Sequence, residues 1–174
     1  MAERMKAQVF YEKEKMTLEE RSVPQVSDTD VLVRVKNCGI CGSDISYFFG
    51  YSPLGTPSGK GPLILGHEFT GEVVEVGAVP KAMKLFKPGD RVVVNPVQHC
   101  NACYACASGH TNMCTNIRVL GVDSDGAMAE YCRSHYSGLF KLPDSVSYAA
   151  GAFTEPFACA VYGVKKLAVE PGQF

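Results

Sequence analysis

Four cysteines with short, regular spacing are the clearest candidates for chemistry in this sequence. Cys100, Cys103, Cys106 and Cys114 lie in the stretch HCNACYACASGHTNMC, with two, two and seven residues between them. Four thiolates in one short loop can complete a tetrahedral shell around zinc and leave no position for water. We therefore expect the loop 95–115 to hold a structural zinc ion that stabilises the fold and performs no catalysis.

Disulfides are the alternative interpretation of these cysteines. The N-terminal stretch MAERMKAQVFYEKEKM has no apolar run of signal-peptide length, so we expect a cytoplasmic protein with reduced thiols. Cysteines two residues apart also suit a shared metal better than each other, because a disulfide requires a specific separation of its Cβ atoms. His99 and His110 border the loop and could replace a cysteine, but with four cysteines available we expect both to face solvent.

Cys41, His67 and Glu68 form a second candidate set with different chemistry. They lie in the segments NCGICGSD and LGHEFTG. A thiolate, an imidazole and a carboxylate can hold a catalytic zinc, which takes three protein ligands and keeps a fourth position for water or substrate. Spacing alone fits equally well a core cysteine and a histidine that hydrogen-bonds a backbone carbonyl. The glycines around the set permit turns and close backbone approach; these are Gly39, Gly42, Gly66 and Gly71.

Composition limits the classes of protein that the chain can belong to. Its 174 residues are 46% apolar, which is enough for one sizeable core. The 17 basic and 18 acidic residues are mixed along the chain and give a formal net charge of -1. We therefore expect neither a nucleic-acid nor a membrane partner. No apolar stretch approaches the length of a membrane span, which predicts a soluble protein.

The elements that would position these residues are mostly short β-strands. Glycine and proline, 17 and 10 residues, separate short alternating or β-branched runs, a pattern typical of antiparallel sheet. The predicted strands cover residues 7–12, 31–37, 70–79, 90–96 and 129–134. After Pro143 the composition becomes rich in alanine and predicts two helices, with Pro156 in the first turn of the second. We expect the remaining cysteines to be small buried thiols; these are Cys38, Cys132 and Cys159.

Five segments, in this order, resemble the N-terminal catalytic domain of the zinc-dependent medium-chain alcohol and polyol dehydrogenases: CGICGSD, GHEFTGEVVEVG, KPGDRVVV, the cysteine loop and TEPFAC. The resemblance runs from about Lys6 to Phe174 and is greatest to the sorbitol and threonine dehydrogenase branch. It implies a mainly β fold, a co-chaperonin (GroES)-like, partly open antiparallel barrel with a zinc loop and C-terminal helices. Residues 1–153 would form the catalytic domain, and residues 154–174 a helix that leads towards a dinucleotide-binding domain.

The resemblance also implies two zinc ions per chain and the ligands of the catalytic one. Cys41 and His67 would bind it. Glu155, which stands where the classical alcohol dehydrogenases have cysteine, competes with Glu68 for the third protein position. We favour Glu68, and the carboxylate that is not bound would hold the zinc-bound water. Glu155 is thus a candidate ligand and a candidate catalytic and substrate-binding residue.

Two further residues gain roles from the resemblance. Ser43 matches the hydroxyl that starts the proton relay away from the substrate, and Tyr47 matches a residue that lines the substrate pocket of the polyol branch. Without the resemblance we would expect Ser43 to cap a turn and Tyr47 to pack in the core.

The implied reaction is the oxidation of a secondary alcohol or polyol to a ketone, through a zinc alkoxide and hydride transfer to NAD or NADP. No GxGxxG fingerprint follows a strand in this sequence. We therefore expect the chain to be part of a longer, homo-oligomeric dehydrogenase, and to bind zinc but transfer no hydride by itself. The alternative is a non-catalytic, zinc-stabilised binding module of the same fold. A zinc-ribbon nucleic-acid binder would have clustered lysine and arginine, which the sequence lacks.

Overall fold

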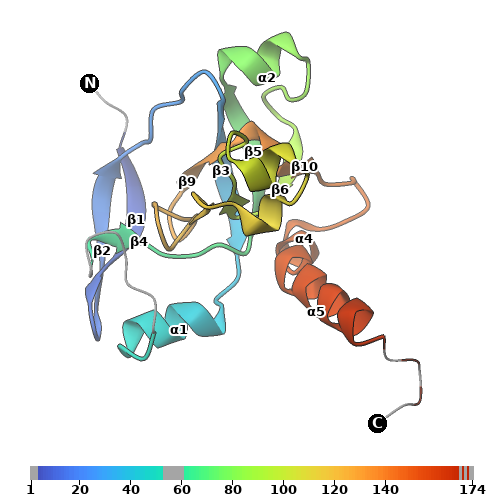
Figure 1. Ribbon diagram of the computed structural model, residues 1–174. Coiled ribbons are helices and arrows are strands. Elements are labelled where there is room, and N and C mark those ends of the chain that lie inside the picture. Colours follow the sequence, from blue (N-terminus) through green and yellow to red (C-terminus); the bar gives the residue numbers. More distant parts are fainter. Residues whose placement is uncertain (1–3, 53–60, 169, 171, 173–174) are drawn as a thin grey trace.

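The computed structural model describes residues 4–52, 61–168, 170 and 172, and antiparallel β-sheet forms most of its framework (Figure 1). The first sheet has the strand order β2–β1–β4. Its strands are β1 (Arg4–Glu12), β2 (Lys15–Ser22) and β4 (Leu63–Ile64). β2 was not predicted, because its sequence KMTLEERS has charged residues at neighbouring positions, as an edge strand can.

The second sheet carries the main core and has the order β10–β6–β5–β3–β9. Its strands are β3 (Asp30–Cys38), β5 (Phe69–Val76), β6 (Arg91–Val94), β9 (Tyr131–His135) and β10 (Leu139–Lys141). Inward-facing side chains of these strands, among them Val33, Phe69 and Val92, are fully buried together. The β-branched runs therefore form strands as predicted, because alternate side chains reach one core.

Residues 126–130 join the two sheets into a partly open barrel. The amide of Gln8 donates to the carbonyl of Met128 on one side, and the amide of Val35 donates to the carbonyl of Glu130 on the other. The connection from β4 to β5 crosses the same junction, and its Leu65 carbonyl accepts from the Met128 amide. A third sheet pairs only β7 (Val97–Gln98) with β8 (Arg118–Val119), at the base of the cysteine loop.

Helices occupy the connections between strands. They are α1 (Gly42–Phe48), α2 (Ala78–Ala82), α3 (Tyr104–Ala107), α4 (Tyr148–Ala152) and α5 (Thr154–Leu167), with 3₁₀ turns at Thr111–Met113 and Tyr136–Gly138. The predicted strand 70–79 is wrong at its end, because β5 stops at Val76 and α2 follows. Gly77 caps α2, and the buried Pro80 sits in its first turn, where a missing amide hydrogen costs no helical hydrogen bond.

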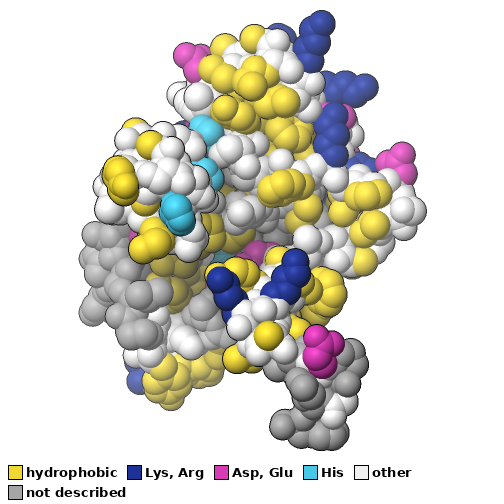
Figure 2. All heavy atoms as spheres, turned by 45° about the vertical axis from the view of Figure 1, so that its right-hand side comes forward, with side chains coloured by type: hydrophobic (Ala, Val, Ile, Leu, Met, Phe, Trp, Pro, Cys, Tyr) yellow, Lys and Arg dark blue, Asp and Glu magenta, His cyan; other side chains and the backbone are white. Residues whose placement is uncertain are grey.

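The two helices predicted after Pro143 are confirmed, and Pro156 lies in the first turn of α5. α5 extends away from the sheets and contains no buried residue (Figures 1 and 2). Cys159 on this helix is exposed, so its predicted burial is wrong, whereas Cys132 is buried and Cys38 is half-buried. No helix in the described part of the chain combines the length and apolar character needed to cross a membrane.

Gly71 offers a test of how closely the central strands approach. A Cβ atom at this position would overlap the carbonyl oxygen of Arg34 on β3 and lie 2.5 Å from Val33 Cγ1. We expect Gly71→Ala to destabilise the fold by about 1–3 kcal/mol and to lower the melting temperature by roughly 5–10 °C. Gly163→Ala on α5, where a Cβ meets no atom within 4 Å, should leave or raise it. Equal melting temperatures for the two variants, measured by circular dichroism, would contradict the close approach.

Candidate metal centres

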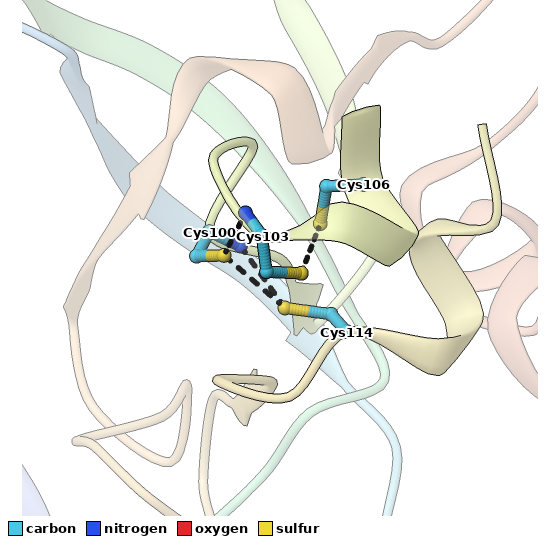
Figure 3. A group of neighbouring side chains, drawn as sticks. All are labelled: Cys100, Cys103, Cys106 and Cys114. Carbon is cyan, nitrogen blue, oxygen red and sulfur yellow. Dashed lines mark hydrogen bonds between the residues drawn. The ribbon is translucent and has the colours of Figure 1, made fainter. Parts of the chain in front are cut away.

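The four cysteines converge at the end of the small sheet β7–β8, as Figure 3 shows. Their Sγ atoms all lie within 4.8 Å of one another. Cys103 precedes α3, Cys106 lies within it, and Cys114 follows the 3₁₀ turn Thr111–Met113. The Cys103–Cys106 and Cys100–Cys114 sulfur pairs are each 3.5 Å apart. His99 and His110 are not members of this set.

Backbone amides point at these sulfurs. The amide of Cys103 donates to Cys100 Sγ at 3.4 Å, and the amide of Asn116 donates to Cys114 Sγ at 3.3 Å. Such bonds favour thiolates, and the amides of Cys106 and Thr115 lower the pKa of Cys103 to about 5. Desolvation, followed by the hydrogen bonds to Cys103 and Cys114, raises the pKa of Cys106 to about 12. A thiolate at Cys106 would be poorly hydrated and would lie next to other sulfur atoms. This all-sulfur donor set fits a structural zinc ion, whose charge stabilises all four thiolates.

The second set comes together across the junction of the two sheets. Cys41 caps α1, while His67 and Glu68 lie in the connection from β4 to β5. One ligand atom of each residue lies within 4.8 Å of the others. His67 and Glu68 are 8% exposed, and Cys41 is half-buried. A mixed sulfur, nitrogen and oxygen set in a partly dehydrated site fits a catalytic zinc ion.

Asp44 links the two sides of this candidate centre, although no role was predicted for it from the sequence. Its buried carboxylate accepts from the amide of Cys41 at 2.8 Å and from the amide of Gly66, next to His67, at 3.3 Å. Its Oδ1 also lies 3.8 Å from His67 Nδ1, an atom with no hydrogen-bond partner among the described residues. Its position three residues after Cys41 could have indicated this role, because an acidic residue at that position completes a helix capping box.

Glycine provides the room for Glu68. The Gly39 amide donates to the Glu68 carbonyl at 2.7 Å, and a Cβ atom on Gly39 would lie 2.5 Å from Glu68 Oε2. Gly66 adopts a positive φ of 91°, which brings the chain round to His67. A Cβ atom on Gly42 would meet nothing within 4 Å, so the expected close approach does not occur there.

The other predicted site residues occupy different surroundings. Ser43 Oγ lies 3.5 Å from His67 Nε2, beside the centre. Tyr47 is buried against Phe10 with ring centroids 6.3 Å apart, and its hydroxyl has no hydrogen-bond partner among the described residues. Glu155 lies in the first turn of α5, outside the set of three, and accepts a 3.6 Å hydrogen bond from Cys159 Sγ.

The start of α5 lies close to Glu68. On α5, burial and then the nearby Glu155 raise the pKa of Cys159. Glu68 and Phe153 also line one cavity of about 190 Å³ between β3 and α4. A larger cavity of about 530 Å³ beside β9 is lined by none of the candidate residues.

Comparison with known proteins agrees with this geometry. Residues 27–144 match the model of the alcohol dehydrogenase GroES-like domain, which confirms the predicted fold class and the resemblance to zinc-dependent dehydrogenases. Sorbitol dehydrogenase of Bacillus subtilis (strain 168) is 36% identical over 169 residues, which are 97% of this chain and 47% of that protein. The chain thus spans about half the length of the curated relatives it matches.

Solved structures show the same relation. A protein from Sinorhizobium meliloti 1021, described as a zinc-binding dehydrogenase and bound to NADP, superimposes with a TM-score of 0.83 at 35% identity over 94% of this chain and 46% of its own. An alcohol dehydrogenase from Escherichia coli CFT073 in complex with NADH gives 0.82 at 34% identity over 94% and 45%. The chain belongs to the family of alcohol dehydrogenase GroES-like domains.

Proposed function

We propose that this chain forms the zinc-binding, catalytic part of a nicotinamide-dependent dehydrogenase that oxidises a secondary alcohol or polyol to a ketone. The observation that carries the proposal is the convergence of Cys41, His67 and Glu68 beside Ser43 in a chain of this family. A non-catalytic binding module of the same fold would use the four-cysteine site for stability and would have no need of a second, mixed centre.

The proposal divides the work between parts of a longer enzyme. Residues 1–153 would form the catalytic domain, and residues 154–174, which begin with α5, would lead towards a dinucleotide-binding domain. The greater length of the relatives and the exposed apolar side chains of α5 support this division. The similar structures hold NADP in one case and NADH in the other, so both cofactors are compatible with the proposal. From the family relation we also propose that the full-length enzyme is cytoplasmic and forms a homo-oligomer.

The residues of the centre can be given chemical roles. Zinc held by Cys41, His67 and a glutamate would lower the pKa of a substrate hydroxyl. Ser43 Oγ, close to His67 Nε2, would accept the hydroxyl proton and pass it to water, after which the substrate carbon can release its hydride. Tyr47 would bind a polyol oxygen through its hydroxyl, which is buried and has no hydrogen-bond partner among the described residues.

The two glutamates would have different roles. Glu68 belongs to the set of three and is buried, which supports it as the third ligand. Glu155 lies outside that set, which supports a role in binding water or a substrate hydroxyl near the metal. Their negative charges together would moderate the Lewis acidity of the metal and permit the exchange of water for substrate.

Zinc content tests the existence of two separate centres. Native mass spectrometry of the wild-type chain should show about two zinc ions, and His67→Ala and Cys103→Ser should each retain about one. His135→Ala is the matched control, because the ring of this histidine hydrogen-bonds to Ser137 and belongs to neither candidate set, so the variant should keep both ions. A single zinc ion that survives His67→Ala but not Cys103→Ser would instead support the non-catalytic module.

Zinc affinity separates the two glutamates. Competition with a chromophoric chelator should show that Glu68→Gln weakens zinc binding at the mixed centre by roughly 100-fold or more, and that Glu155→Gln weakens it by roughly 10-fold. Glu72→Gln on β5 is the control, because Glu72 pairs with Lys36 in a half-exposed ion pair outside the centre. A larger loss for Glu155→Gln than for Glu68→Gln would exchange the two assigned roles.

A further inference from the structure

Arg91 makes a set of contacts that the proposed mechanism does not use. It begins β6, and its side chain is 22% exposed. Its Nη1 donates to the carbonyl of Pro143 at 2.9 Å, and its Nη2 donates to the carbonyl of Val146 at 2.6 Å. The guanidinium carbon also lies 4.5 Å from the centroid of the Tyr148 ring. A planar fork with several donors suits this pattern, because one ammonium group cannot reproduce it.

These contacts hold the segment 143–148, which connects β10 to α4. Thr70 on β5 provides a second attachment, since its hydroxyl donates to the carbonyl of Tyr148 at 2.7 Å. Side chains of the central sheet therefore donate to the carbonyls of Pro143, Val146 and the first residue of α4, Tyr148, and the Pro143 carbonyl also accepts from the Val146 amide.

The segment leads through α4 to Glu155 at the start of α5. α4 packs against β3 and β5. Phe153 is the C-cap residue of α4 and also the N-cap residue of α5, so α5 follows α4 directly. Because α5 contains no buried residue, its start is positioned through α4. The cavity beside Glu68 is lined by Ala149, Ala152 and Phe153, so the junction of the two helices directly borders the metal centre.

We propose that Arg91 is a positioning residue for the mixed metal centre, because it holds the segment 143–148 and thereby helps to place α4 and the start of α5, which carries Glu155, relative to Cys41, His67 and Glu68. This inference rests on the proposed role of Glu155. It assigns a function to the arginine of the KPGDRV segment, which lies 64 positions before Glu155 in the sequence.

A double-mutant cycle tests the inference on the 174-residue chain, with zinc as the probe and chelator competition as the measurement. Arg91→Met should weaken zinc binding at the mixed centre by roughly 10-fold, as Glu155→Gln does, because it displaces the same carboxylate. The double variant should bind no more weakly than Glu155→Gln alone. Arg91→Lys, which keeps the charge but not the fork, should also weaken binding.

Arg133→Met is the matched control. Arg133 lies on β9 at the other edge of the same sheet, where it donates to the Gln25 carbonyl at 3.1 Å and pairs with Asp30. It should leave zinc affinity unchanged. If Arg91→Met does not fold, Thr70→Val removes the other attachment of the segment and should produce the same loss with the same non-additivity.

The outcomes separate the inference from the proposed function. Wild-type affinity in Arg91→Met, or losses that add in the double variant, would overturn the positioning role and leave the role of Glu155 intact. Unchanged affinity in Glu155→Gln would overturn the role of Glu155 itself, and the positioning role with it.

Discussion

The buried connection between β4 and β5 is the constraint on which the centre depends, because it carries His67 and Glu68 through the junction of the two sheets. Buried backbone groups must find hydrogen-bond partners. The carbonyls of Ile64, Leu65 and Gly66 accept from the amides of residues 126–128, and the Glu68 carbonyl accepts from Gly39. These bonds fix the two candidate ligands from both sides, so the barrel junction and the candidate metal centre are parts of one structure.

Electrostatics in the same volume favour a dication. Cys41, Glu68 and Asp44 can each carry a negative charge in a site that has lost much of its water. Cys38 responds to this environment, since burial, Asp44 and Glu68 raise its pKa to about 12. Concentrated negative charge of this kind is costly unless a cation balances it. Metal binding and the architecture of the junction are therefore expected to support each other.

The sequence predicted those features whose physical cause is local. The valine-rich strands follow from alternation, and the four-cysteine loop follows from spacing alone, because its ligands lie within 15 residues of chain. α1 was missed, because GSDISYF is too short for a helical apolar period to be visible. Asp44 was missed because its partners, the amides of Cys41 and Gly66, meet only in the folded chain. The burial predicted for Cys159 was wrong, because α5 has apolar residues but none of them is buried in the described chain.

The two glutamates differ in how firmly the fold supports them. Glu68 stands on a strand connection whose backbone is bonded on both sides and whose side chain packs against Gly39. Glu155 stands on a helix with exposed apolar side chains at Phe157, Val161 and Val164, which contributes no buried contact of its own. A helix of this length gains little stability without packing. This difference agrees with the proposed roles, in which Glu68 on its rigid support is a permanent ligand and Glu155, which is held only through the five-residue helix α4 and the side-chain bonds before it, binds water or substrate near the metal.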